Sequence, residues 1–240
     1  MTKGLYTITE HILIANAVWR MTLSGDTASL KKPGQFVNIE LPSFYLRRPF
    51  SVMDWDRNGL TVIYKVVGAG TEYMSRMAVG EKLDLLVGLG NGFDTCKGLK
   101  PLIIGGGVGT PPLYGVAKAL AERGAVPDAA LGFALHKDAM LIDELKALGV
   151  RVHTAFMSDG KPVTGLLSEL ADRCDYYYAC GSEAMLRAVF ASCRLSGQLS
   201  LEARMSCGFG ACMGCTCLTL AGGKRVCADG PVFYKEELTW

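Results

Sequence analysis

Five of the nine cysteines in this 240-residue chain lie at or after residue 207. Four of them have the spacing Cys207-x4-Cys212-x2-Cys215-x11-Cys227, and the first three match the plant-type pattern of a [2Fe–2S] cluster. An odd number of cysteines, crowded in this way, indicates metal or cluster ligation rather than disulfides. We therefore predict that Cys207, Cys212, Cys215 and Cys227 hold a [2Fe–2S] cluster.

A structural zinc site is the alternative for the same cysteines. Zinc sites usually combine two short Cys-x2–4-Cys pairs, and only Cys212 and Cys215 form one cleanly here. A zinc site would make the chain a nucleotide-binding regulator with a zinc-stabilised tail and no redox role. Cys217 is predicted to be a bystander, because it follows Cys215 too closely to be a further ligand.

A second candidate for chemistry is the run Arg48-Pro49-Phe50-Ser51, which follows a predicted strand at residues 35–41. The planar guanidinium of Arg48 can pair with a pyrophosphate through parallel hydrogen bonds. The hydroxyl of Ser51 can reach a flavin ring nitrogen, and the backbone amides of Gly70-Thr71 suit a phosphate. The alternative is an exposed arginine pair that merely precedes a strand.

A third candidate, Gly105-Gly106-Gly107-Val108-Gly109-Thr110, joins an apolar run at 101–104 to a predicted helix at 111–123. Thr110 is predicted to cap that helix, whose free amides favour a nucleotide pyrophosphate. Cys180-Gly181 follows a predicted strand at 176–179, and ligands of open α/β sheets bind at such strand ends. Cys180 is therefore expected to border a nicotinamide ring. A tight turn without a ligand is the alternative, and no residue separates NAD from NADP.

The segments that carry these candidates differ in texture. Short β-branched or aromatic runs at 35–41, 60–67 and 82–87, set between glycines and prolines, predict an antiparallel β-barrel. Beyond residue 100, strand candidates at 101–104, 129–134, 150–156 and 176–179 alternate with helix candidates at 111–123, 141–148, 163–173 and 182–195, which predicts a doubly wound parallel sheet. The expected fold class is β + α/β, with a barrel at 1–97, a sheet domain at 98–198 and a small cluster segment at 199–240.

Composition argues against several classes of function. The net charge of +2 and the lack of a basic stripe argue against nucleic acid binding. The most apolar stretch, residues 101–120, is interrupted by glycines and prolines, so no membrane span is expected. The N-terminus lacks the apolar run of a signal peptide, which predicts a cytoplasmic protein.

Taken in order, the motifs resemble those of the ferredoxin-reductase-like flavoproteins, and most closely the electron transfer subunits of bacterial dihydroorotate dehydrogenase type B. The stretches that carry the resemblance are Arg48–Ser51, Gly70-Thr71, Gly88–Phe93, Gly105–Pro112, Cys180-Gly181 and the tail from Met205 to Phe233. Two departures stand out. Phe50 replaces the tyrosine of the wider reductase family, and the gap before Cys227 is short.

The resemblance implies a set of cofactor sites. FAD is expected at Arg48, Pro49, Phe50, Ser51, Ile63, Tyr64, Lys65, Gly70 and Thr71. NAD is expected at Gly105, Gly106, Gly107, Gly109, Thr110, Cys180 and Gly181, with Ser51 and Cys180 next to the reacting atoms. The four cysteines are expected to hold the [2Fe–2S] cluster.

The resemblance also implies a partner and a reaction. In that family the subunit pairs with an FMN-containing subunit that oxidises dihydroorotate, in a heterotetramer that serves pyrimidine biosynthesis. Electrons would pass from that FMN through the cluster and FAD to NAD⁺, and the overall reaction would be (S)-dihydroorotate + NAD⁺ → orotate + NADH + H⁺. A reductase subunit of another NAD(P)-linked iron–sulfur flavoprotein complex is the alternative.

Overall fold

The computed structural model describes all 240 residues. The first part of the chain, up to Leu89, builds a closed antiparallel barrel with strand order β1-β2-β5-β4-β3-β6. The barrel elements are β1 (Thr2–Ala15), β2 (Val18–Ser24), β3 (Phe36–Ile39), β4 (Arg48–Trp55), β5 (Gly59–Lys65), α1 (Ala69–Ser75) and β6 (Lys82–Leu89). Strand alternation fills its interior: on β6, for example, Leu83, Leu85 and Val87 are buried.

The predicted barrel is confirmed, with differences in its strands. The runs at 35–41, 60–67 and 82–87 form β3, β5 and β6. Strands β1, β2 and β4 were not predicted from the sequence. On β1 only Tyr6 and Ile8 are fully buried, because much of this long strand faces solvent, so its apolar pattern is weak.

A six-stranded sheet with order β14-β11-β10-β7-β8-β9 follows the barrel. Its strands are β7 (Pro101–Gly106), β8 (Asp128–Phe133), β9 (Arg151–Phe156), β10 (Tyr176–Cys180), β11 (Gly197–Ser200) and β14 (Val232–Tyr234). The first five run parallel, and β14 pairs antiparallel with β11. The strand order reverses between β7 and β10, which is where a doubly wound sheet binds its ligand.

The helices of this sheet are α2 (Pro111–Glu122), α3 (Ile142–Ala147), α4 (Leu167–Leu170) and α5 (Glu183–Ser192). Short 3-10 turns lie at Gly107–Gly109, His136–Asp138, Met157–Asp159, Val163–Leu166, Ala171–Arg173 and Lys235–Glu237. The helix predicted at 163–173 is broken into such turns around α4, and Gly165, a weak helix former, lies in its first turn. None of the helices combines the length and apolar character needed to cross a membrane.

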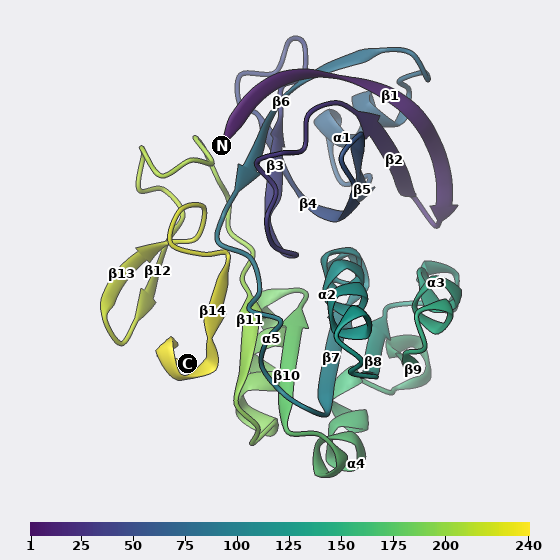
Figure 1. The fold of residues 1–240 in the computed structure, drawn as a ribbon, viewed down its shortest axis with the longest axis vertical. Helices are drawn as coiled ribbons and strands as arrows, with labels where there is room; N and C mark the ends of the chain where they lie inside the picture. Colours follow the sequence, from purple (N-terminus) through teal and green to yellow (C-terminus); the bar gives the residue numbers. More distant parts are fainter.

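The tail runs from the end of β11 past the barrel and back to the sheet (Figure 1). Its regular elements are a hairpin of β12 (Thr216–Thr219) and β13 (Gly222–Arg225), followed by β14. Residues 201–215 form neither helix nor strand. The division expected after residue 198 falls inside β11, and β14 returns to the same sheet, so the three-segment division of the chain stays a prediction.

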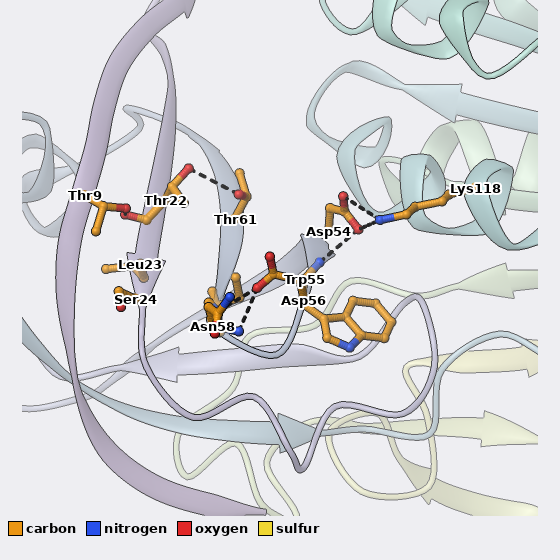
Figure 2. A pocket seen from close by; sticks show the side chains of 12 residues that line it. Thr9, Thr22, Leu23, Ser24, Asp54, Trp55, Asp56, Asn58, Thr61 and Lys118 are labelled. Atoms are coloured by element: carbon orange, nitrogen blue, oxygen red, sulfur yellow. Dashed lines mark hydrogen bonds and ion pairs between the residues drawn. The ribbon is translucent and has the colours of Figure 1, made fainter.

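Barrel and sheet are joined where α2 packs against β4. Lys118 Nζ on α2 lies 2.8 Å from Asp54 Oδ1 on β4, as Figure 2 shows. A Cβ at Gly115 would lie 3.1 Å from the Met53 carbonyl oxygen, so the helix approaches the strand closely. The pocket drawn in Figure 2, of about 390 Å³, is lined largely by polar side chains and contains none of the predicted cofactor residues.

Candidate functional site

A cavity of about 300 Å³ lies where the barrel, the sheet and the tail meet. Eight of the residues predicted for flavin or nicotinamide line it: Pro49, Phe50, Ser51, Ile63, Tyr64, Lys65, Thr71 and Cys180. The opposite wall comes from Ser200, Leu201, Glu202, Ala203, Met205 and Pro231, and Phe36, Val67, Val108 and Pro112 complete it. The fold therefore brings together side chains that are far apart in the sequence, on β4, β5 and β10.

Arg48 and Gly70 do not line this cavity, but they lie against each other next to Pro49 and Thr71, which do. A Cβ on Gly70 would come within 2.8 Å of Arg48 Nε, so only glycine leaves the guanidinium in this place. The loop before α1 is held by Thr71, whose Oγ1 accepts hydrogen bonds from the backbone N–H groups of Val67 (2.9 Å) and Gly68 (3.2 Å). A guanidinium next to a turn with free backbone N–H groups suits a pyrophosphate.

Aromatic rings form the part of the cavity wall where the sequence departs from the reductase pattern. Phe50 packs on Tyr64 with ring centroids 5.6 Å apart. The Tyr64 hydroxyl lies 2.8 Å from His11 Nε2, and His11 Nδ1 lies 2.9 Å from the Met77 carbonyl oxygen. Because that oxygen can only accept, Nδ1 carries the proton and Nε2 accepts from Tyr64. Burial raises the pKa of Tyr64, and its hydroxyl is occupied by His11. Because it donates to His11, the Tyr64 hydroxyl does not take over the role of the tyrosine hydroxyl that Phe50 lacks.

A second cavity, of about 570 Å³, adjoins the first at the carboxyl edge of the sheet. The two share Lys65, Val108 and Glu202 as lining residues. The predicted residues Gly106 and Gly107 line the second cavity, and so does Ser182, whose hydroxyl caps α5. A ligand that spans both cavities would therefore meet residues of β5, of the glycine turn and of the segment after β11.

The glycine turn after β7 is explained partly by packing. Added Cβ atoms at Gly106 and Gly181 would lie 2.3 Å and 2.6 Å from atoms of Met185, and one at Gly109 would lie 2.4 Å from the Cys180 carbonyl oxygen. Gly107 differs, because its φ is +51° and nothing lies within 4 Å of its Cβ position. Of these glycines, Gly107 is the one that packing does not require.

Gly105 and Thr110 also serve the turn rather than the cavities. A Cβ on Gly105 would lie 2.9 Å from Thr110 Oγ1. The Thr110 side chain makes no capping hydrogen bond, and its hydroxyl is buried without a partner. Thr110 is the residue before α2, as predicted, with Pro111 first in the helix. Its side chain does not cap, because the 3-10 turn Gly107–Gly109 leads Thr110 into helical backbone, whereas a capping side chain needs an extended residue.

Cys180 ends β10 and is buried at the edge of the first cavity. Burial raises the pKa of its thiol to about 12, with the nearby Glu202 carboxylate adding to the shift. The thiol is therefore neutral at physiological pH, which fits a small packing neighbour of a ring better than a nucleophile.

Glu202 is a residue that the sequence reading missed. It lines both cavities and a third of about 510 Å³ between α5 and the tail. Its side chain is exposed, and its carboxylate has no hydrogen-bond or ion-pair partner. Desolvation by the residues around it raises its pKa. The available signal was an acidic residue just after a strand at the ligand edge, but β11 itself was not predicted.

The four predicted cluster cysteines form two pairs in the tail. The backbone N–H of Cys227 donates to Cys215 Sγ at 3.4 Å, and both of these side chains are buried. Cys207 lies close to Cys212, which is exposed and contributes to the lowering of the Cys207 pKa. Burial raises the pKa of Cys207, but the backbone N–H groups around it, led by that of Phe209, outweigh burial and lower the pKa to about 6.

Backbone N–H donors directed at sulfur fit an iron–sulfur cluster, and so does a glycine-rich loop that packs closely around the cysteines. Gly208 and Gly210 have φ of +76° and +91°, and added Cβ atoms would lie 2.3 Å from Asn38 Nδ2 and 2.8 Å from Ala228 Cβ. No three histidine, cysteine or acidic side chains converge to hold a single ion. Each pair of thiols can ligate one iron of a two-iron cluster, so the arrangement fits the predicted [2Fe–2S] site.

Cys217 lies on β12, outside both pairs. It lines the 510 Å³ cavity with Trp240, and burial raises the pKa of its thiol. Its absence from the ligand set stays a prediction.

Sequence comparison finds relatives over the full chain. A family model described as the iron–sulfur cluster binding domain of dihydroorotate dehydrogenase B matches residues 202–239. The dihydroorotate dehydrogenase B (NAD(+)) electron transfer subunit of Streptococcus mutans is 38% identical, over 98% of this chain and 98% of its own length. The protein of that name from Caldanaerobacter subterraneus is also 38% identical and covers 94% of both chains.

Solved structures show the same architecture. The structure of an NADH-dependent reduced ferredoxin-NADP oxidoreductase matches with a TM-score of 0.85 at 28% identity, over 99% of this chain and 90% of that chain. The ferredoxin-NADP⁺ reductase of Plasmodium falciparum matches with a TM-score of 0.66 at 15% identity, over 78% of this chain and 88% of that chain. At that lower identity the likeness shows the fold alone.

Proposed function

This chain belongs to the family of dihydroorotate dehydrogenase B electron transfer subunits, and we propose that it passes electrons from a dihydroorotate-oxidising partner through one [2Fe–2S] cluster and one FAD to NAD⁺. The observation that carries the proposal is the three-way junction. One cavity is bounded by the barrel, by the ligand edge of the sheet and by the tail that bears the paired cysteines.

FAD is assigned to the first cavity. Its pyrophosphate is proposed to be held by Arg48, Gly70 and Thr71, and the support is the contact between Arg48 and Gly70 next to the turn that Thr71 holds. The remaining wall, Pro49, Phe50, Ser51, Ile63, Tyr64 and Lys65, is mainly apolar with a few polar groups, which suits a flavin ring. Ser51 is the wall residue whose hydroxyl can donate to a ring nitrogen, so Ser51→Ala should slow flavin reduction by NADH.

NAD is assigned to the second cavity, with its nicotinamide next to the first. Gly106 and Gly107 line this cavity, and Gly105, Gly109, Thr110 and Gly181 would support them by shaping the turn and the strand end from behind. Cys180 would border the nicotinamide from the first cavity. Glu202 lies where the two cavities meet, and its carboxylate would favour the positive charge of an oxidised nicotinamide.

The [2Fe–2S] cluster is assigned to Cys207, Cys212, Cys215 and Cys227. When bound, the flavin exchanges electron pairs with nicotinamide and single electrons with the cluster. The chain's own residues hold these groups in sequence. Cys180 and Pro231 bound the same flavin cavity from the nicotinamide side and the tail side.

The partner is proposed to be an FMN-containing catalytic subunit, assembled with this chain in a cytoplasmic heterotetramer of pyrimidine biosynthesis. The cluster loop offers a surface for it, because Phe209, Cys212 and Met213 are exposed. Exposed apolar side chains beside a functional group mark a contact site. Replacing Phe209 and Met213 with serine should weaken the complex and leave flavin reduction by NADH unchanged.

A second candidate is a reductase subunit of another NAD(P)-linked iron–sulfur flavoprotein complex. The observation in its favour is the match to the NADH-dependent ferredoxin-NADP oxidoreductase over almost the whole chain. The two candidates share every cofactor site and differ in the partner that supplies electrons.

Co-expression separates these candidates. The chain, purified anaerobically with a dihydroorotate-oxidising flavoprotein from the same cell, should contain flavin and two irons per chain and should reduce NAD⁺ with dihydroorotate. A loaded chain that accepts electrons only from ferredoxin would support the second candidate. A colourless chain without iron or flavin would overturn both.

A further inference from the structure

The tail rests on the outer face of β3, the strand that also borders the flavin cavity. Side chains alternate along a strand, so Phe36 and Asn38 point to the same side, while Val37 lies in the barrel core. Phe36 lines the flavin cavity and belongs to one apolar cluster with Cys215 and Cys227. The same face of β3 therefore forms part of the flavin cavity wall and packs against the cysteine tail.

Asn38 holds the tail at the first predicted cluster ligand. Its Nδ2 donates to the Cys207 carbonyl oxygen at 3.0 Å, across 169 positions of sequence. Asn38 is 1% exposed, and its Oδ1 is buried with no partner. A buried amide with half of its bonds unmade costs free energy, so its place needs an explanation. The bond to Cys207 is the one hydrogen bond that the side chain makes, and the side chain also packs against Gly208.

Asn91 holds the tail beyond the last predicted ligand. Its Nδ2 donates to the Val232 carbonyl oxygen at 2.7 Å and to that of Asp229 at 3.3 Å, and its Oδ1 accepts from the Val232 N–H at 3.1 Å. Its backbone N–H donates to the Gly230 carbonyl oxygen at 2.8 Å. The side chain thus pairs with both backbone groups of Val232, as a neighbouring strand would.

The two asparagines enclose the four cysteines between them. Asn38 bonds Cys207, and Asn91 bonds the segment 229–232 that follows Cys227. Pro231, inside that segment, lines the flavin cavity opposite β4. Both anchors come from the barrel, and neither side chain is one of the predicted cofactor residues.

We propose that Asn38 and Asn91 are positioning residues that fix the cluster-bearing tail against the flavin-binding barrel and so set the rate of electron exchange between cluster and flavin. The inference rests on the proposed function for the presence of those two groups. Electron tunnelling slows steeply with distance, and a loop without regular structure has no ladder of its own to fix that distance.

The test replaces each asparagine with leucine in the full chain loaded with FAD and cluster. Leucine is larger than asparagine but keeps its branching at Cγ, cannot hydrogen-bond and adds no charge that would shift the cluster potential directly. Stopped-flow mixing with NADH should show flavin reduction at the normal rate. Cluster reduction should be slowed about tenfold or more in Asn38→Leu/Asn91→Leu, a loss typical of a misplacement near 1 Å.

Electron paramagnetic resonance of the reduced cluster gives a readout besides activity, since freeing the Cys207 backbone should broaden the signal. Asn58→Leu is the control, because Asn58 lies in a barrel turn and its side chain makes no hydrogen bond. Normal cluster reduction and an unchanged signal in loaded Asn38→Leu and Asn91→Leu single variants would overturn the inference. A wild-type chain without flavin or iron would instead overturn the proposed function.

Discussion

The barrel–sheet junction and the cysteine tail position their functional groups by different means. Ser51, Tyr64 and Cys180 lie on β4, β5 and β10, where ladders of backbone hydrogen bonds fix each side chain. The cysteines from Cys207 to Cys215 lie in a segment without helix or strand. Side chains from outside that segment, such as Asn38 and Arg225, hold it by hydrogen bonds to its backbone. A loop of this kind can position ligands accurately only where neighbouring residues fix its backbone.

The loop also bends in ways that strands do not. Besides its glycines, Met213 has a φ of +59°, a conformation that costs a non-glycine residue free energy. Arg225 closes the loop from the far side, because its Nη1 donates to the Gly210 carbonyl oxygen at 2.7 Å and its Nε lies 3.1 Å from Asp229 Oδ2. Substitutions in the tail and in the junction should therefore affect different cofactors.

The largest effect is expected from Cys215→Ser in the tail. Cys215 is buried and paired with Cys227, so its loss should abolish cluster assembly, while the junction keeps its FAD. Iron analysis should fall to background, and NADH should still reduce the flavin. Cys217→Ser is the matched control and should retain iron. Loss of flavin together with iron in Cys215→Ser would show that the two regions are not separable.

On the junction side, Gly70→Ala should weaken FAD binding and spare the cluster. The added methyl would lie 2.8 Å from Arg48 Nε and displace a flexible side chain, at little cost in stability. Loss of a charge-assisted pair to pyrophosphate corresponds to about tenfold or more in affinity. Gly68→Ala, whose Cβ has nothing within 4 Å, is the control in a fluorescence titration with FAD. Equal affinities in the two variants would remove Arg48 from the site.

A smaller effect, on stability alone, is expected at the edge of the sheet away from both regions. Asp128 is buried at the start of β8 and accepts from Arg151 Nη2 (2.6 Å) and His153 Nε2 (3.1 Å). Asp128→Asn should lower the free energy of unfolding by about 1–3 kcal/mol. Cofactor content should not change, and a variant that lost cofactors would show that this edge communicates with the junction.

The same residue gives a pH dependence with a defined sign. The hydrogen bond from Arg151 is the main cause that lowers the pKa of Asp128 below its usual 3.8, against desolvation. A lowered carboxyl pKa stabilises the fold above the unfolded value and is lost as pH falls through the folded value. Denaturation of wild type and Asp128→Asn should therefore converge as the pH falls below about 3.8.

The smallest effect is expected for Glu202→Gln, where the two regions meet. Desolvation of this exposed side chain by its neighbours raises the pKa of Glu202 above its usual 4.5, so the carboxylate forms as pH rises through that higher value. NAD⁺ binding to the wild type should strengthen over that range, and the variant should bind about three- to tenfold more weakly at neutral pH, as for a partly solvated charge contact near 1 kcal/mol. Isothermal titration at several pH values measures this, and a parallel profile in the variant would remove Glu202 from the nicotinamide site.

The sequence predicted those parts of the molecule that depend on local pattern. The spacing of the cysteines, the strand–turn–helix at Gly105–Pro112 and the alternation of strands and helices after residue 100 are all local signals, and the corresponding fold class is confirmed. The roles of Ser51 and Cys180 stay predictions, although the structure places both in the wall of one cavity.

What the sequence could not predict depends on contacts made at long range. β14 has three residues and exists because β11 offers it an edge. The bonds of Asn38 and Asn91 join residues 169 and 141 positions apart. Asn91 lies within the motif Gly88–Phe93, but that motif does not reveal its partner, and no local pattern marks Asn38. Glu202 gains its importance from three cavities that meet only after barrel, sheet and tail have packed together.

The central claim is that one chain holds a flavin site open to nicotinamide on one side and to a cluster on the other. An anaerobic titration of the loaded full chain with NADH, followed by visible absorption and electron paramagnetic resonance, tests this directly. The account predicts that NADH bleaches the flavin and that the reduced-cluster signal then appears in the same chain. A flavin that is reduced while the cluster stays oxidised and silent, at any excess of NADH, would contradict it.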